Sequence, residues 1–435
     1  MRIVQLTPGS GDSFYCENCL RDAALVGAMR KLGHDVLLVP MYLPLQDGQM
    51  EAFSNAPIFF GGINVYLQQK WGLFRKTPRW IDRLFDRPWL LRLVARRAKM
   101  TNAKDLGEAT ISMLRGEEGR QVKELDRLAE WLGARENRPD ILCLSNALLA
   151  GLARCLKARL GVPIVSLLQD EDEFLDGLPS PYAKQAWEII IGRSGDIDGF
   201  IAVSKYYAKV MQERLKLDTG RVYVVYTGIS LDGYGQLRSA PQTPTIGYLS
   251  RICPRKGLDT LVDAFVILRE NEKLKNAKLR IAGGSSGNDG PFINLIRQRL
   301  DSHGLSGDVD FVPDFGRDSR LAFLEGLSVL SVPEKRPASY GLYVLEALAA
   351  GVPVVQPASG VFPELLEMTG GGVLCKPNSA PALASAIKPL LLDANYAQHL
   401  ARQGRDAVFK KFNVEQTAAE LVRIYDVIVR QFNRS

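Results

Sequence analysis

Short runs of continuous apolar residues alternate with helical patterns along this chain, and the alternation occurs in two successive blocks. Strands are predicted in the first block at "RIVQLTP", "HDVLLVPMY", "DILCLS", "VPIVSLLQ" and "DGFIAVS", and in the second at "IGYLS", "AKLRIAGG", "VDFVP", "LSVLSVP" and "VPVVQP". Because most of these runs are predominantly apolar and are not apolar only at every second residue, each strand should be covered on both faces, as in a parallel sheet between two layers of helices. The sequence therefore predicts an α/β fold with two doubly wound, Rossmann-like domains.

A polar, proline-rich stretch, "LRSAPQTPT" at 237–245, separates the two blocks and is typical of a linker. We expect an N-terminal domain at 1–236, a second domain at 245–412, and a C-terminal helix at 413–435 that packs back on the first domain. Ligands of doubly wound sheets bind beyond the carboxyl ends of the strands. Two such sheets facing each other would therefore place a ligand in the cleft between the domains.

The composition is that of a soluble globular chain, with 46% apolar and 24% charged residues. The N-terminal apolar run ends at Pro8 and Gly9, which makes it too short for a signal peptide or a membrane-spanning helix. No later segment has enough uninterrupted apolar residues to cross a bilayer. We therefore expect a cytoplasmic protein, either free or bound peripherally to the inner face of the membrane.

A helical insertion is predicted at about 70–135, and its first part is strongly basic. Residues 75–99 carry nine basic side chains against Asp82 and Asp86, a surplus equal to the net charge of +7 of the whole chain. Tryptophans and leucines are interleaved with the arginines, as in a helix that lies on anionic lipid headgroups. The alternative is a solvated insertion whose aromatic residues pack on the parent domain. No nucleic-acid-binding pattern is present, and we expect no such partner.

The sequence offers little for a metal site. Cys16 and Cys19 form a CxxC pair in "YCENCL", but no second pair or paired histidine follows at ligand spacing. His34, His303 and His399 are far apart in the sequence. We therefore interpret the two cysteines as ordinary helix residues and expect no metal and no other cofactor.

Three features of the second block point to a phosphorylated ligand. Arg251 and Lys256, in "SRICPRKG", follow a predicted strand and precede a helix, where two cations form a ready diphosphate site. Gly283, in "AGGSSG", allows the backbone to approach a ligand closely. Glu346 is a carboxylate among apolar neighbours and is suited to accept from a vicinal diol such as a ribose. The alternatives are solvated surface charges for the two cations and a backbone-capping role for Glu346.

Taken together, these stretches resemble the retaining family 4 glycosyltransferases of the GT-B fold, which use nucleotide-diphosphate sugars. The resemblance spans nearly the whole chain, through "MRKLGHDVLLVP", "DGFIAVSKYYAKVM", "VVYTGISLDGY", "RICPRKGLDTLVDAF", "LRIAGG", "GLYVLEALAAGVPVVQPASGVFPELLE" and "GGGVLCKP". It implies a hexosyltransferase that acts with retention of configuration on a glycan, lipid-linked or small-molecule acceptor. Such enzymes serve the synthesis of glycans and cell-envelope polysaccharides.

The resemblance also implies roles for individual residues. Glu346 matches the second glutamate of the family's E-x7-E motif and would bind the ribose hydroxyls, while Arg251 and Lys256 match the pair that holds the diphosphate. Glu364 matches a position with a structural role. Backbone contacts to the donor are implied for two loops, which contain Gly9 and Gly11 near the N-terminus, and Gly341, Leu342 and Tyr343 beneath the phosphates and sugar.

The chain departs from the family pattern at the first glutamate of that motif, which is Ala338 here. Glu334 is a possible substitute carboxylate if the loop bulges. Where the family often has histidine after a strand, this chain has Gln169, and the usual Asn-Gly pair is Thr227-Gly228.

The reaction of the family needs little from a protein base, because the leaving diphosphate itself takes the acceptor proton. Arg251 and Lys256 would then act catalytically by stabilising the negative charge that develops on the β-phosphate. Gln169 would hydrogen-bond a donor hydroxyl, and Asp170 or Glu171 is placed to contact the acceptor or serve as a base.

Two other functions stay open because of Ala338 and Gln169. One is a catalytically silent relative that binds a nucleotide sugar or a glycan. The other is a nucleotide-sugar epimerase of the same two-domain plan, although the histidine and acidic residues that such enzymes use are not evident in this sequence.

Overall fold

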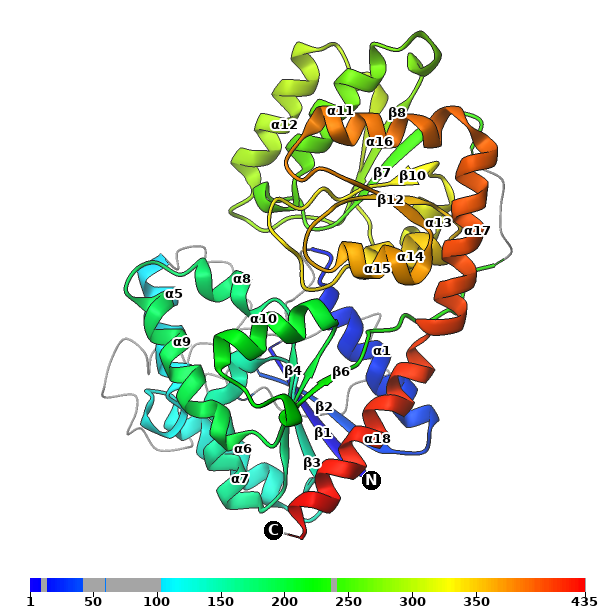
Figure 1. The fold of residues 1–435 in the computed structure, drawn as a ribbon. Coiled ribbons are helices and arrows are strands. Elements are labelled where there is room, and N and C mark those ends of the chain that lie inside the picture. Colours follow the sequence, from blue (N-terminus) through cyan, green and yellow to red (C-terminus); the bar gives the residue numbers. More distant parts are fainter. Residues whose placement is uncertain (9–13, 42–58, 60–102, 236–240, 435) are drawn as a thin grey trace. The chain divides into compact units, whose positions relative to one another are not determined.

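The computed structural model describes residues 1–8, 14–41, 59, 103–235 and 241–434 (Figure 1). The basic segment 75–99 and the glycines Gly9 and Gly11 lie outside the described residues. The described residues form two compact units. Unit 1 consists of those within 1–8, 18–225 and 418–434, and unit 2 of those within 14–17 and 226–417.

Unit 1 is built on a parallel sheet whose six described strands follow the order β2-β1-β3-β4-β5-β6. The strands are β1 (Arg2–Thr7), β2 (Asp35–Pro40), β3 (Ile141–Leu144), β4 (Ile164–Leu168), β5 (Gly199–Ala202) and β6 (Val222–Val224). Ile3 of β1 pairs with both Val36 and Ile141, so β1 lies between β2 and β3. The strand order reverses between β1 and β3, and sheets of this kind bind ligands at the carboxyl ends of the strands beside such a reversal.

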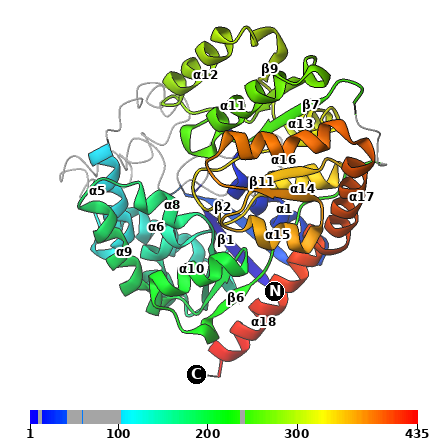
Figure 2. The same cartoon turned by 45° about the horizontal axis from the view of Figure 1, so that its top comes forward.

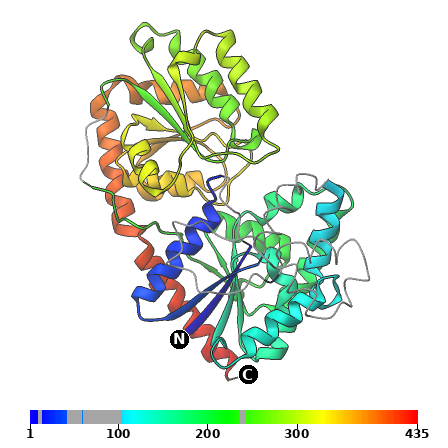
Figure 3. The ribbon, with the colours of Figure 1, turned by 180° about the vertical axis from the view of Figure 1, so that it is seen from behind.

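Helices cover both faces of this sheet (Figures 1 and 3). They are α1 (Glu17–Lys31), α5 (Ala103–Leu114), α6 (Val122–Gly133), α7 (Ala153–Leu160), α8 (Glu171–Asp176), α9 (Tyr182–Arg193) and α10 (Lys205–Leu215), with short 3-10 helices η3 (Gly116–Glu118), η4 (Ala147–Leu152), η5 (Ser194–Asp196) and η6 (Thr219–Arg221). Every residue of β3, β4 and β5 is buried, as their continuous apolar sequences predict.

The last helix, α18 (Val414–Phe432), packs on the sheet of unit 1 along most of its length. The hydroxyl of Tyr425 lies 3.3 Å from the sulfur of Cys143 in β3. At Gly199 in β5, a Cβ atom would meet the side chain of Ile428, so the glycine leaves room for the helix. The first residues of α18, up to Thr417, belong to unit 2.

Unit 2 has the strand order of the dinucleotide-binding fold, β9-β8-β7-β10-β11-β12, among its described residues. The strands are β7 (Thr245–Leu249), β8 (Lys278–Ala282), β9 (Val309–Val312), β10 (Val329–Leu330), β11 (Val354–Pro357) and β12 (Gly372–Cys375). Ile246 of β7 pairs with Leu279 of β8 and with Val329 of β10, and all the pairings are parallel. The chain reverses direction across the sheet between β7 and β10, which predicts a ligand site at the carboxyl ends of these two strands.

The strands of unit 2 lie between α11 and α16 on one face and α14 and α15 on the other (Figures 1 and 2). The helices are α11 (Leu258–Arg269), α12 (Gly290–Ser302), α13 (Arg317–Glu325), α14 (Leu342–Ala349), α15 (Phe362–Thr369), α16 (Ala380–Leu392) and α17 (Ala394–Lys411), with 3-10 helices η7 (Pro254–Lys256), η8 (Glu272–Leu274) and η9 (Ser306–Asp308). The predicted α/β class with two Rossmann-like sheets is therefore confirmed.

Candidate active site

The loops that follow β7 and β10 meet at the strand reversal of unit 2. Gly257 begins α11 with a φ of 74°, a left-handed conformation that glycine adopts without strain. A Cβ atom on Gly257 would overlap the carbonyl oxygen of Pro333, three residues beyond β10. A glycine is required here, because only its backbone allows the two loops to pack this closely.

Arg251 lies in the first of these loops and is held by an ion pair. Its Nε atom lies 3.0 Å from Oδ2 of Asp289, and its Nη2 atom donates to the hydroxyl of Ser286 at 2.7 Å. Burial acts to raise the pKa of Asp289, but the hydrogen bonds from Arg251 and Ser286 outweigh it, so the pKa is lowered and the carboxylate is charged. The guanidinium group also lies over the ring of Phe14, 4.9 Å from its centroid.

Lys256 is the second predicted cation, and it is only 7% exposed. Its Nζ atom lies 2.8 Å from Oε1 of Glu334 and 3.6 Å from Oε1 of Glu17. The hydroxyl of Tyr343 donates to the same oxygen of Glu334 at 2.9 Å. Burial and the Glu334 carboxylate both raise the pKa of Tyr343, so the phenol stays protonated as a donor. Glu334, the predicted substitute carboxylate, thus lies directly on the ammonium group of Lys256.

The N-terminus of α14 adds a third positive group to this region. Gly341 precedes the helix, and the backbone N–H of Leu342 donates to Oε2 of Glu17 at 2.7 Å. Free N–H groups and the helix dipole make such a terminus a binding site for anions, and a carboxylate occupies it here. A Cβ on Gly341 would lie 3.0 Å from the ring of Phe362, so a side chain would fit poorly at this position.

Glu346 lies one turn further along α14 and is 5% exposed. Its Oε2 atom accepts from the hydroxyl of Tyr15 at 2.7 Å, and its Oε1 atom lies 3.2 Å from the guanidinium of Arg320. Burial disfavours the charged form of Arg320, but the Glu346 carboxylate outweighs it and raises the pKa of Arg320. Both carboxylate oxygens therefore face side-chain donors, one a hydroxyl and the other a guanidinium.

Gly283 has a φ of 121°, which a residue with a side chain rarely adopts. A Cβ atom there would also overlap the backbone of Ser250, in the loop that carries Arg251. The carbonyl oxygen of Gly283 accepts from the backbone N–H of Tyr15 at 2.8 Å. Gly283 thus allows a close approach of the Ser250 and Tyr15 backbones, and its predicted contact with a ligand stays a prediction.

No carboxylate is available at Ala338, which is 6% exposed and whose carbonyl oxygen accepts from the N–H of Val361 at 3.0 Å. Gly360 packs against its backbone with a φ of 61°, and a Cβ on Gly360 would overlap the peptide groups of Ala338. Glu364 receives a hydrogen bond from the hydroxyl of Tyr226, consistent with a structural role.

Gln169 belongs to unit 1 and lies in a buried polar cluster at the carboxyl ends of β1, β3 and β4. Its Oε1 atom accepts from Nη1 of Arg21 at 2.7 Å, and Arg21 also pairs with Asp22 at 2.8 Å and donates to the carbonyl of Ser145. Thr7 donates to Asp22 at 2.8 Å. The hydrogen bond from Arg21 identifies the oxygen of the Gln169 amide and leaves its nitrogen as the donor on the other side of the group.

Asp170 follows Gln169 with a φ of 60°, a left-handed conformation that aspartate tolerates, and precedes α8. Glu171 is fully buried, and its oxygens accept from the N–H of Ala147 at 2.9 Å and from the hydroxyl of Tyr207 at 2.8 Å. The same hydroxyl lies 2.9 Å from Oδ1 of Asp172. Since one phenol proton cannot serve two carboxylates, a protonated carboxyl group satisfies this arrangement best.

The pKa of Glu171 predicts how stability depends on pH. Burial is the main cause that raises this pKa from 4.5 to about 7. Because the folded-state pKa exceeds the ordinary value, the folded protein binds the extra proton, so the stabilisation that Glu171 contributes is fully present below pH 4.5 and is lost as the pH rises through about 7. We expect Glu171→Gln to reduce the loss in thermal midpoint between pH 5 and pH 8, as measured by calorimetry. The same loss in Glu171→Gln and in the exposed control Glu213→Gln would contradict this.

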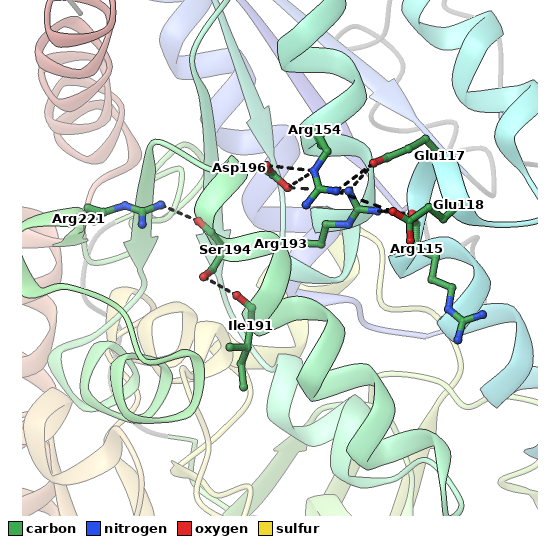
Figure 4. A network of polar contacts seen from close by, with 9 residues as sticks. All are labelled: Arg115, Glu117, Glu118, Arg154, Ile191, Arg193, Ser194, Asp196 and Arg221. Atoms are coloured by element: carbon green, nitrogen blue, oxygen red, sulfur yellow. Dashed lines mark hydrogen bonds and ion pairs between the residues drawn. The ribbon is translucent and has the colours of Figure 1, made fainter.

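A separate charged cluster of unit 1 joins η3, α7, α9 and η5 (Figure 4). Arg193 is 4% exposed, and its Nη1 atom lies 2.6 Å from Glu117. Burial acts to raise the pKa of Glu117, but the hydrogen bond from Arg193 outweighs it and lowers the pKa. The Nε atom of Arg154 lies 3.1 Å from Asp196. Arg193 and Arg154 are each matched by a carboxylate, so we assign this pair of ion pairs a structural role.

The structure brings most of the predicted donor residues together in unit 2. These residues are Arg251, Lys256, Gly283, Glu334, Gly341, Leu342, Tyr343 and Glu346. Gln169 and Asp170 lie in unit 1. Sequence reasoning missed five further residues at these sites, which are Tyr15, Glu17, Arg320, Asp289 and Arg21. Each lies in an ordinary helical or loop pattern, and only the fold places it beside a residue distant in the sequence.

Among the described stretches of the chain, no group of histidine, cysteine, aspartate and glutamate side chains could hold a metal ion. Cys16 and Cys19 form no disulfide. None of the described helices is long and apolar enough to cross a membrane.

Two Rossmann-like units, one of them with a cationic site at its strand reversal, define the GT-B class of fold. Solved structures match this chain in fold over nearly its whole length. Sucrose-phosphate synthase from Thermosynechococcus elongatus matches with a TM-score of 0.72 at 17% identity over 100% of both chains. HepE from Anabaena, solved in complex with UDP-glucose, matches with a TM-score of 0.71 at 15% identity over 98% of this chain and 100% of that one.

Two family models match successive parts of the sequence. The model described as "Glycosyltransferase Family 4" matches residues 23–232, and that described as "Glycosyl transferases group 1" matches residues 235–407. The chain therefore belongs to the group 1, family 4 glycosyltransferases, which confirms the resemblance drawn from the motifs.

Curated relatives match about half of the sequence. The GDP-mannose-dependent α-(1-6)-phosphatidylinositol monomannoside mannosyltransferase of Mycobacterium tuberculosis is 31% identical over 41% of this chain and 46% of that protein. The D-inositol 3-phosphate glycosyltransferase of Jonesia denitrificans is 27% identical over 48% of this chain and 52% of that protein. The chain thus spans about half the length of these relatives.

Proposed function

We propose that the protein transfers a hexose from a nucleotide-diphosphate sugar to an acceptor, with retention of anomeric configuration. The observation that carries this proposal is the arrangement at the β7–β10 strand reversal, where Lys256 and the N-terminus of α14 face the Glu17 carboxylate, and Arg251 lies over the ring of nearby Phe14. Three positive groups at the ligand-binding edge of a Rossmann-like sheet suit a diphosphate. The buried Glu346 carboxylate, which already accepts from a hydroxyl, suits the ribose of the same donor.

The residues of unit 2 would act mainly through charge. As the bond between the anomeric carbon and the β-phosphate oxygen breaks, negative charge builds up on the leaving diphosphate. Lys256 and the N–H groups of α14 would stabilise this charge in a site shielded from water, where one such donor is worth about 3 kcal/mol. Glu334 would act as a positioning residue, because its carboxylate fixes the ammonium group of Lys256. The leaving diphosphate would take the acceptor proton, so that no protein base is needed.

The buried cluster of unit 1 supports a second part of the proposal. Arg21 orients the amide of Gln169, whose nitrogen would donate to a hydroxyl of the transferred sugar. Asp170 would contact the acceptor. The two curated relatives are named for acceptors that contain inositol. That similarity favours a polyhydroxylated acceptor, which is a saccharide or lipid-linked.

Turnover with nucleotide sugars tests the proposal directly. The protein is incubated with UDP-, GDP- and ADP-hexoses and a mixture of acceptors, and the release of nucleoside diphosphate is measured. We expect release with at least one donor and an α-linked product from an α-linked donor by NMR. Binding of nucleotide without release would favour the catalytically silent relative. Interconversion of sugar isomers without release would favour the epimerase.

The basic segment 75–99 supports a further proposal, that the enzyme associates peripherally with anionic membrane. We expect it to sediment with vesicles that contain phosphatidylglycerol but not with pure phosphatidylcholine, and the bound fraction should fall with added salt because exposed charges are screened. Replacing Arg92, Arg96 and Arg97 by glutamine should abolish the sedimentation. If binding depends on neither lipid charge nor salt, this proposal is wrong. The alternative, a solvated insertion whose aromatic residues pack on the parent domain, would then be favoured.

A further inference from the structure

We infer that residues Phe14–Glu17, "FYCE", act as an internal ligand of the donor site and must leave it when the nucleotide sugar binds. This inference rests on the proposed function. The four residues belong to unit 2, although α1 continues from Glu17 into unit 1. Three of the four contact a group that the proposed function assigns to the donor.

Tyr15 occupies the position proposed for the ribose. Its phenol donates to Oε2 of Glu346 at 2.7 Å, as a ribose hydroxyl would, and its ring lies beneath the guanidinium of Arg320 at 5.7 Å. Burial and the Glu346 carboxylate raise the pKa of Tyr15, so the hydroxyl carries its proton and acts as the donor. Because Glu346 is only 5% exposed with the phenol on its Oε2 atom, a ribose hydroxyl would have to replace the phenol to reach that oxygen.

Glu17 occupies the position proposed for a phosphate. One of its oxygens accepts from the N–H of Leu342 at 2.7 Å, and the other lies 3.6 Å from Nζ of Lys256. A carboxylate at a helix N-terminus beside a lysine reproduces the contacts of an anionic phosphate oxygen. The side chain of Glu17 is 12% exposed, so it fills this position closely.

Two further contacts fasten the segment along the same edge. Phe14 forms an isolated antiparallel bridge with Gly284, and its ring lies under the guanidinium of Arg251, an arrangement that attracts a cation to the ring face. The backbone N–H of Tyr15 bonds to Gly283. Phe14, Tyr15 and Glu17 thus satisfy Arg251, Glu346 and Lys256 at once, and the donor would have to replace all three contacts.

A segment that competes with the donor lowers the apparent affinity by the fraction of molecules in which the site is open. If the segment is docked in nine molecules of ten, removing it strengthens binding about tenfold. A segment that instead helped to hold the donor would give the opposite result, because its removal would weaken binding. The sign of the change in dissociation constant therefore decides between the two roles.

The experiment uses the full chain with UDP and GDP as probes and calorimetry as the readout. Tyr15→Phe and Glu17→Gln are compared with matched changes at exposed positions, Tyr396→Phe and Glu213→Gln. We expect the first two variants to bind the nucleotide about three to ten times more tightly than wild type, and the controls to bind like wild type. Unchanged or weaker binding in both Tyr15→Phe and Glu17→Gln would overturn the inference.

Hydrogen exchange distinguishes displacement of the segment by nucleotide from an effect of the changed charge at position 17 alone. Saturating nucleotide should speed exchange of the Tyr15 amide, which loses its bond to Gly283, while the Leu342 amide stays protected by a new acceptor. Slower exchange at Tyr15 would contradict displacement. If wild type binds nucleotide and Lys256→Ala weakens it, but the segment variants change nothing, only the internal ligand is refuted. If no nucleotide binds to any form, the proposed function fails and the inference fails with it.

Discussion

Lys256→Ala is expected to lower kcat/KM for the nucleotide sugar about a hundredfold, which corresponds to roughly 3 kcal/mol of lost transition-state stabilisation. The effect should be large because the ammonium group is buried and faces the space proposed for the diphosphate. Most of the loss should fall on kcat, since the charge on the β-phosphate grows as the bond breaks. Arg251→Ala should cost about tenfold, mainly in KM, because Arg251 is more exposed and shared with Asp289.

A control and a second variant distinguish a loss of catalysis in Lys256→Ala from a loss of folded protein. Lys278→Ala removes a lysine of the same unit that pairs with Asp308, and it should leave kcat/KM unchanged. Because Lys256→Ala leaves Glu334 buried without its ion pair, the double variant Lys256→Met, Glu334→Gln removes both charges and keeps the volume. The assignment of Lys256 is wrong if the double variant keeps its thermal midpoint and also keeps wild-type kinetics.

Glu346→Ala is expected to raise KM for the donor by tenfold or more, since a hydrogen bond to a charged group is worth about 1.5–3 kcal/mol. The better readout compares a ribose donor with its 2′-deoxy and 3′-deoxy analogues. Wild type should prefer the ribose donor by a similar factor. The Glu346→Ala variant should lose that preference, because the carboxylate that accepts from the hydroxyls is gone.

Glu364→Ala provides the matched control for this second prediction. Glu364 lies in the same unit and accepts from the hydroxyl of Tyr226, so its loss should lower stability but leave the preference for ribose intact. If the Glu346→Ala variant still discriminates the ribose donor from both deoxy analogues, Glu346 does not bind the ribose hydroxyls. It would leave Glu346 as the structural partner of Arg320.

The fold was predictable because a strand that is buried on both faces has apolar residues at consecutive positions. "IVSLL" in β4 and "GFIA" in β5 are buried at every position. These sequences lack the regular alternation of apolar and polar residues that is typical of a strand exposed on one face. The sequence shows glycines in the segments that follow two strands of unit 2, and Gly257 and Gly283 among them have positive φ. The need for glycine at these two positions could not be predicted, because the atoms that a side chain would overlap belong to Pro333 and Ser250, which lie on other loops.

The partners of the site residues could not be predicted, because the topology and not the local sequence creates them. Lys256 and Glu334 are 78 residues apart, and Tyr15 and Glu346 are 331 apart. Glu17 looks like any acidic residue in the first turn of a helix, where the dipole favours it. Nothing in its neighbours indicates that it lies against a second helix terminus.

The decisive experiment for the donor site is a structure of the full chain with a bound nucleoside diphosphate. We expect the diphosphate within hydrogen-bonding distance of Lys256, Arg251 and the N–H groups that begin α14, with the ribose on Glu346. A diphosphate bound elsewhere, with Lys256 still paired only to glutamates, would contradict it.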